Sequence, residues 1–152
     1  MISSFAPFLK FLNFLNMNSF RKKAFIAILA GMGVGFIVVM FVETMGSFMA
    51  PPPKGLDFYN KDLVTAYMQS APLSMYLLLL TGYGLGAFAG GWVTNLQARG
   101  SGYRPALITG VGLMVMGILN LLTLWHPAWF WWVSVPAYLV FAWLGGQRVL
   151  RH

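Results

Sequence analysis

Three polar side chains are candidates for chemistry, because each lies in or beside a long apolar stretch. Glu43 is the acid within the first apolar run, Asn120 lies near the end of a later one, and His126 follows it. An ionisable residue in a membrane span is a functional candidate and is expected to face the bundle interior or a partner. Carboxylate and imidazole groups exchange protons and bind metals, so this cluster could bind a cation, relay a proton or hold a polar head group.

A structural role for Glu43 is the favoured alternative. A glutamate that is hydrogen-bonded to an Asn or to a Trp N–H would simply hold helices together. Glu43 and His126 without a third ligand at a defined spacing are too few for a metal site, so we expect no metal and no cofactor. No nucleophile with a neighbouring base, no paired carboxylates within a span and no phosphate loop occur, so we expect no enzymatic activity.

The composition is that of an integral membrane protein. Of 152 residues, 59% are hydrophobic and only 9% are charged, whereas about a quarter of the residues of a soluble domain are charged. The net charge of +7 comes from basic residues that flank the apolar runs, which indicates membrane orientation and no nucleic-acid partner. The absence of cysteine excludes disulfides and thiolate metal sites.

The sequence predicts an all-α membrane fold in two parts. Residues 1–23 are interpreted as an amphipathic segment in the membrane interface, with a disordered tail that touches lipid as the alternative. Residues 24–152 are expected to form a four-helix transmembrane domain. The predicted spans are 24–46, 72–96, 105–124 and 129–146, the last bent by Pro136. In the loop after the first span, Pro51-Pro52-Pro53 is followed by a short helix capped by Asn60.

Basic residues predict the orientation of these spans. They concentrate before the first span, between the second and third, and after the fourth, whereas the opposite loops contain Lys54 and Lys61 beside Asp57 and Asp62. Both termini are therefore expected in the cytoplasm. The residues on that side are Lys10, Arg21, Lys22, Lys23, Arg99, Arg104, Arg148 and Arg151.

The two halves of the chain show a possible duplication of a two-helix hairpin. Gly33-Val34-Gly35 precedes Glu43 at the same spacing at which Gly110-Val111-Gly112 precedes Asn120. Such a repeat preserves orientation, and it would place Asn120 at the depth of Glu43 with His126 just beyond, near the outer leaflet. Chance matching is the alternative, because small residues are common in membrane helices.

Glycines and tryptophans mark two further features. Small residues four apart let helix backbones approach closely in lipid, and the predicted packing positions are Gly31, Gly35, Gly82, Gly86, Gly90, Gly145 and Gly146. Tryptophans at the outer boundary are typical of an aromatic belt, and a bound pigment or quinone is the alternative. The residues of this predicted rim are Trp125, Trp129, Trp131 and Trp132.

Several short motifs extend over almost all of the chain after residue 24. They are FVETMG at 41–46, PPPKGLD at 51–57, AYM at 66–68, GAFAGGW at 86–92, NL at 120–121, HPAWFW at 126–131 and LGG at 144–146. Together they resemble a widespread group of small four-helix bacterial membrane proteins that have no assigned activity. The resemblance implies a location in the bacterial inner membrane and transfers no catalytic role.

These observations favour an accessory or structural subunit that packs against a second copy or a larger membrane complex. The expected partners are membrane lipids and other membrane subunits or a homo-oligomer. One alternative is a homo-oligomeric, ion-coupled or small-solute transporter that uses Glu43. Another is a protein that binds lipid or quinone at the tryptophan rim.

Overall fold

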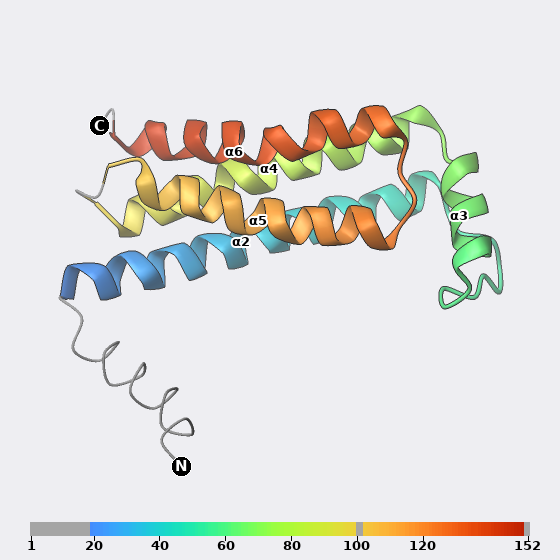
Figure 1. Ribbon diagram of the computed structural model, residues 1–152, viewed down its shortest axis with the longest axis horizontal. Helices are drawn as coiled ribbons and strands as arrows, with labels where there is room; N and C mark the ends of the chain where they lie inside the picture. Colours follow the sequence, from blue (N-terminus) through green and yellow to red (C-terminus); the bar gives the residue numbers. More distant parts are fainter. Residues whose placement is uncertain (1–18, 100–101, 151–152) are drawn as a thin grey trace, which may run out of the picture.

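The computed structural model describes residues 19–99 and 102–150, and the regular structure in that part of the chain is helical throughout. The long helices α2 (Ser19–Met49), α4 (Leu73–Gln97), α5 (Arg104–Thr123) and α6 (Ala128–Leu150) alternate in direction, and the short helix α3 (Lys61–Ser70) lies across one end (Figure 1). Each of the four long helices is long and apolar enough to span a membrane. The predicted all-α fold with four such helices is confirmed.

The first helix is longer than the predicted span 24–46. It begins at Ser19 and ends at Met49, because Arg21, Lys22 and Lys23 are compatible with a helix and nothing breaks it before Pro51. Glu43 therefore lies about 9 Å along the axis from the end of α2 at 1.5 Å per residue, whereas the predicted span would place it about 4.5 Å from the end. The predicted interfacial segment lies, up to residue 18, outside the described residues.

The fourth helix also exceeds its predicted span, 129–146, and continues through Pro136 to Leu150. The predicted span ends at Gly146, the second of two adjacent glycines. Both glycines are buried, and a Cβ atom on Gly146 would lie 2.6 Å from the Ala106 side chain. Packing has therefore overridden the weak helix propensity of glycine here.

The short helix α3 begins where Asn60 predicts. The Asn60 side chain accepts hydrogen bonds from the backbone N–H groups of Asp62 and Leu63, which satisfies donors that the first turn leaves unpaired. The Tyr67 hydroxyl donates to the Ala50 carbonyl at 2.5 Å, and the Tyr76 hydroxyl donates to the Met68 carbonyl at 2.5 Å. These two bonds tie α3 to the ends of α2 and α4.

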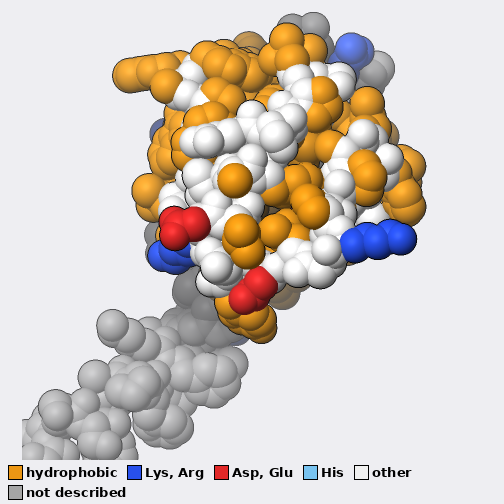
Figure 2. All heavy atoms as spheres, turned by 90° about the vertical axis from the view of Figure 1, so that its right-hand side faces the viewer, with side chains coloured by type: hydrophobic (Ala, Val, Ile, Leu, Met, Phe, Trp, Pro, Cys, Tyr) orange, Lys and Arg blue, Asp and Glu red, His pale blue; other side chains and the backbone are white. Residues whose placement is uncertain are grey.

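The two ends of the bundle differ in charge. The α3 end carries acidic and basic side chains together, scattered among hydrophobic and uncharged ones (Figure 2). The opposite end contains the start of α2, the connection from α4 to α5 and the end of α6 (Figure 1). Its charged residues are all basic, and they include Lys22, Lys23, Arg99, Arg104 and Arg148.

Close backbone contacts make α4 the centre of the bundle, packed mainly against α2 and α6. A Cβ atom on Gly31 would lie 2.5 Å from the Gly90 carbonyl oxygen, and one on Gly35 would lie 2.8 Å from the Gly86 carbonyl oxygen. On the other side of α4, a Cβ on Gly145 would overlap the Phe88 carbonyl. All seven glycines predicted as packing positions lie in contacts between helices of this chain.

The glycines matched in the proposed duplication do not share a packing environment. A Cβ atom added to Gly33 would have no neighbour within 4 Å, whereas one on its counterpart Gly110 would meet Ala142 and the Tyr138 backbone on α6. Gly35 packs on α4, but its counterpart Gly112 meets Met32 on α2. The shared spacing in sequence therefore corresponds to different contacts in the two halves.

A buried polar cluster joins the helices near the basic end. The hydroxyls of Thr94 and Thr109 are 2.7 Å apart, which links α4 to α5. The Asn95 side-chain amide donates to the carbonyls of Gly102 at 3.2 Å and Gly146 at 3.1 Å. Polar side chains that bond across membrane helices hold them together, so this cluster fixes one end of the bundle.

The contact between α4 and α6 predicts a large difference between two glycine variants. Gly145→Ala should lower the stability by about 1–3 kcal/mol, because its methyl group has no space beside the Phe88 backbone. Gly33→Ala should leave the thermal midpoint nearly unchanged, since a methyl group there meets open space. Thermal unfolding in mild detergent measures both, and equal midpoints would contradict the packing described.

Candidate functional site

Glu43, Asn120 and His126 line one cavity of about 210 Å³ beneath α3. We call this the end cavity, and Tyr67 and Met68 of α3 also line it. Glu43 and Asn120 line a second cavity of about 140 Å³, which lies between α2 and α5. The structure thus brings together the three residues that the sequence predicts to converge near one end of the bundle.

The second cavity, which we call the seam cavity, is built by all four long helices. It shares Glu43, Tyr83 and Asn120 with the end cavity, so the two cavities meet at these side chains. The rest of its lining is apolar or aromatic and comprises Phe36, Val39, Met40, Leu113, Met116, Gly117 and Tyr138. A mostly apolar cavity with a few convergent polar groups is typical of a ligand site.

Tyr83 is the hydrogen-bond partner of Glu43, in place of the Asn or Trp N–H that the sequence suggests. The Tyr83 hydroxyl donates to Glu43 Oε1 at 3.3 Å, which is long for a bond between two oxygens. Among the described residues, no hydrogen bond is found to Glu43 Oε2 or to the Asn120 side chain. The flanking Gly82 and Gly84 are the one sequence signal for Tyr83, because they allow neighbouring helices to approach it.

Stacked aromatic rings form the inner wall of the seam cavity. The rings of Tyr83 and Tyr138 are stacked with centroids 5.4 Å apart, and Phe130 meets Tyr83 edge-on at 5.8 Å. Gly117 permits this arrangement, because a Cβ atom there would lie 2.5 Å from the Tyr138 hydroxyl. Tyr83 and Tyr138 are almost fully buried, so the wall is held by the core and not by the membrane.

His126 is buried in the end cavity as a neutral ring. Its Nδ1 atom lies 2.9 Å from the Leu124 carbonyl oxygen, and its ring stacks on Phe130 with centroids 5.1 Å apart. Burial lowers the pKa of His126 below the usual value, and the hydrogen bond to Leu124 only partly opposes this effect. The tautomer that donates from Nδ1 leaves Nε2 as an acceptor.

The lining residues set the charge of the two cavities. Glu43 is their only acidic residue, and no Lys or Arg lines either of them. Across the described ranges 19–99 and 102–150, no group of three His, Asp or Glu side chains is placed to hold a metal ion. The Ser47 hydroxyl donates to the Glu43 carbonyl, so it is not paired with His126 as a nucleophile would be.

The predicted tryptophan rim divides into packed and exposed members. Trp129 packs edge-on against Tyr76 and Phe130, whereas Trp132 is 82% exposed. Trp131 and Trp132 border a shallow surface cavity of about 400 Å³ together with Val135 and Pro136.

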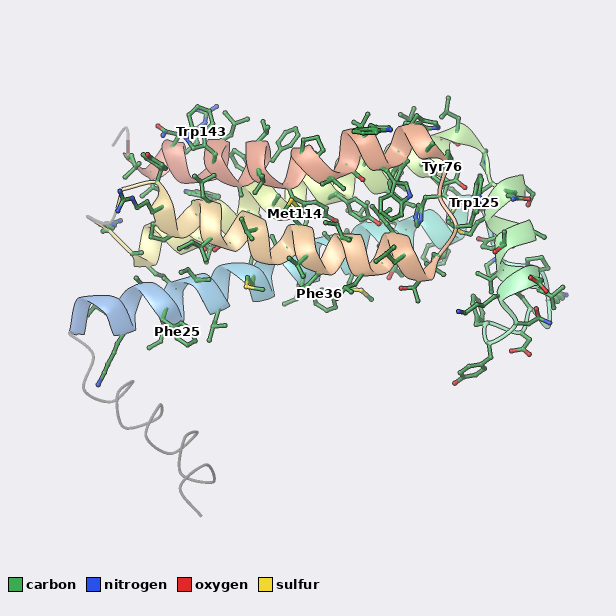
Figure 3. All side chains as sticks on the ribbon, in the orientation of Figure 1. Phe25, Phe36, Tyr76, Met114, Trp125 and Trp143 are labelled. Atoms are coloured by element: carbon green, nitrogen blue, oxygen red, sulfur yellow. The ribbon has the colours of Figure 1, made fainter. Side chains whose placement is uncertain are left out.

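A second group of tryptophans lies towards the basic end. Trp92 and Trp143 occur late in α4 and α6 and are partly exposed. Trp125 and Trp143 lie towards opposite ends of the bundle (Figure 3). The sequence prediction named only the rim at the α3 end.

Comparison of the chain with models of known protein families, with characterised proteins and with solved structures finds no match. The function is therefore inferred from the geometry of the site.

The burial of His126 predicts a loss of stability in acid. Because the folded-state pKa lies below the unfolded value of about 6.5, the unfolded state binds the proton more readily. Stability should be fully present above about pH 6.5 and should fall as the pH drops from that value to the folded-state pKa. Thermal midpoints at about pH 7.5 and about pH 5.5 test this, and the decrease should be smaller in His126→Gln. An identical decrease in both proteins would contradict it.

Proposed function

We propose that this chain is a multi-pass protein of the bacterial inner membrane with both termini in the cytoplasm. Four helices of sufficient length and apolarity support this proposal. The basic residues at one end fit the cytoplasmic side, and partly exposed tryptophans towards both ends fit two membrane interfaces.

Within this bundle, we propose that the Glu43 site binds a small hydrophobic molecule with a polar head group. The observation that carries the proposal is the seam cavity, where the Glu43 carboxylate accepts a hydrogen bond from the Tyr83 hydroxyl and Asn120 also lines the mostly apolar space. A ligand whose head group reaches Glu43 could leave its apolar part against α2 and α5. The function proposed is binding and not catalysis, since no nucleophile is paired with a base there.

The hydrogen bonds favour binding over a purely structural role for Glu43. At the basic end, Thr94 and Thr109 share a hydrogen bond of 2.7 Å, and Asn95 makes one bond to α6 and one to the connection between α4 and α5. Glu43 has a single bond of 3.3 Å, and its residue is only partly buried. A carboxylate that served to pin helices would be expected to have shorter and more numerous partners.

The site is also a better ligand position than the tryptophan rim. The cavity beside Trp131 and Trp132 is formed by one segment of α6 alone and has little polar lining. The seam cavity is built from four helices and has three polar side chains from different helices. Convergent polar groups give a ligand a defined orientation.

Native mass spectrometry of protein purified in mild detergent should show a bound hydrophobic molecule. Glu43→Gln should lose most of this molecule, because the glutamine amide has no negative charge and replaces one acceptor oxygen of the carboxylate with an NH2 donor. Asp62→Asn is the matched control, as it makes the same chemical change at an exposed acid on α3. Equal occupancy in wild type, Glu43→Gln and Asp62→Asn would contradict the proposed site.

A second candidate function is assembly with another copy or a larger membrane subunit through α2. In the most apolar window of α2 only 17% of residues are buried, against 50% in α4. The glycines of α2 that meet α4 are already used within the chain. An assembly surface would instead comprise the exposed side chains of Ile37, Phe41 and Phe48, which are at least 66% exposed.

Cysteine crosslinking tests this assembly, because the natural chain contains no cysteine. Ile37→Cys should give a crosslinked dimer in native membranes if α2 meets α2 of a second copy. Val140→Cys on α6 is exposed to a similar degree and serves as the control. Self-assembly through α2 would be contradicted if Ile37→Cys gave no crosslinked dimer, or if both variants gave equal amounts of it.

A further inference from the structure

We propose that the ligand of the seam cavity is a hydrophobic amine in its ammonium form, bound by Glu43 in exchange for a proton. This inference rests on the proposed binding function and names the chemical class of its ligand. It is carried by the charge and the aromatic lining of the cavity.

Charge complementarity selects a cation. Glu43 is the one charged side chain among the residues that line the seam cavity, and no Lys or Arg is available there or in the adjoining end cavity. An anionic head group would meet a carboxylate without any compensating cation. A neutral head group would leave an ionised Glu43 with the Tyr83 hydroxyl as its one described partner.

The aromatic lining favours the same class of ligand. Phe36, Tyr83 and Tyr138 come from three different helices and line the cavity beside Glu43. Ammonium groups are attracted to the negative faces of aromatic rings, and proteins use aromatic cages to bind them. A carboxylate in a cavity that three aromatic rings help to line therefore suits an ammonium group better than a hydrated metal ion, for which the described residues offer no set of ligands.

The cavity is bounded towards the outside of the bundle by apolar residues. Phe36 and Met40 of α2 and Met116 of α5 line the cavity and are also exposed on the surface of the chain. The ligand could enter there from the lipid and leave its apolar part against these side chains. The amine head group of a phospholipid is disfavoured, because it would bring its phosphate close to Glu43.

Exchange with a proton follows from the surroundings of Glu43. The groups that face it are Tyr83 from α4, Asn120 from α5 and Tyr138 from α6, and Tyr67 of α3 and His126 also line the end cavity. None of them is a cation at neutral pH, because burial lowers the pKa of His126 and keeps it neutral. Either a proton or an ammonium group can therefore neutralise Glu43, but not both. The end cavity reaches Pro52 and Phe58, which are exposed, so the proton has a route to water at that end.

Calorimetric titration with benzyltrimethylammonium tests the inference in lipid nanodiscs made of phosphatidylcholine. This probe has a fixed charge at every pH, and neopentylbenzene is its neutral isostere. Wild-type protein at about pH 8 should bind the cation at least about tenfold more tightly than the isostere. Binding should weaken at least about tenfold in Glu43→Gln, and it should weaken in wild type as the pH falls and Glu43 is protonated.

Control variants separate charge from folding. Asp62→Asn should bind the cation like wild type, and Glu43→Asp, which keeps the negative charge, should retain both binding and its pH dependence. Glu43→Gln is compared with wild type only if it elutes from a size-exclusion column at the wild-type volume. If Glu43→Gln does not fold, the pH dependence of cation binding in Glu43→Asp and in wild type tests the inference. Cation binding that is independent of pH would overturn the exchange with a proton.

The possible outcomes distinguish this inference from the proposed function. Equal binding of the cation and its isostere would overturn the ammonium class but would leave a hydrophobic site at Glu43. If neither probe binds, the ammonium class is overturned. The proposed Glu43 site is then tested separately by native mass spectrometry, which shows whether a bound molecule is lost in Glu43→Gln. Competition by phosphatidylethanolamine added to the nanodiscs would overturn the choice of a free amine over a lipid head group.

Discussion

The bundle depends on the close approach of the α4 backbone to α2 and α6. Gly31 and Gly35 face Gly90 and Gly86 on one side of α4, and Gly145 lies against Phe88 on the other. Without a hydrophobic driving force between helices in lipid, such contacts and hydrogen bonds across helices supply the association energy. The glycines are therefore used to build the chain's own core, and they leave many of the larger apolar side chains of α2 exposed on the surface of the chain.

The same packing makes the two ends of the bundle unlike each other. At the basic end, Thr94, Thr109 and Asn95 join α4, α5 and α6 by buried hydrogen bonds. Over their whole lengths, α2 and α5 meet less extensively than α2 and α4 do, and the seam cavity lies between α2 and α5. A hydrogen-bonded end and a hollow end in one small bundle are consistent with a binding site that the core holds in shape.

The hollow end is organised around aromatic rings. Tyr83, Tyr138 and Phe130 form a packed wall beneath Glu43, and His126 continues it towards α3 by stacking on Phe130. The wall presents one hydroxyl to the carboxylate, and apart from Asn120 the rest of the lining is apolar or aromatic. Because Glu43 is partly buried in a mostly apolar lining, its charge has a strong influence on which head group could bind.

The sequence by itself determined the helical class, the four apolar spans and the Asn60 cap of α3, because each depends on composition and local spacing. It also identified Glu43, Asn120 and His126, since polar residues are conspicuous within apolar runs. The tertiary structure alone decided that Tyr83 is the partner of Glu43, that the matched glycines Gly33 and Gly110 have different neighbours, and that α6 continues past Gly145 and Gly146. The physical reason is that helix spacing shows which residues share a face, whereas the rotation of each helix against its neighbours is set by packing over the whole bundle.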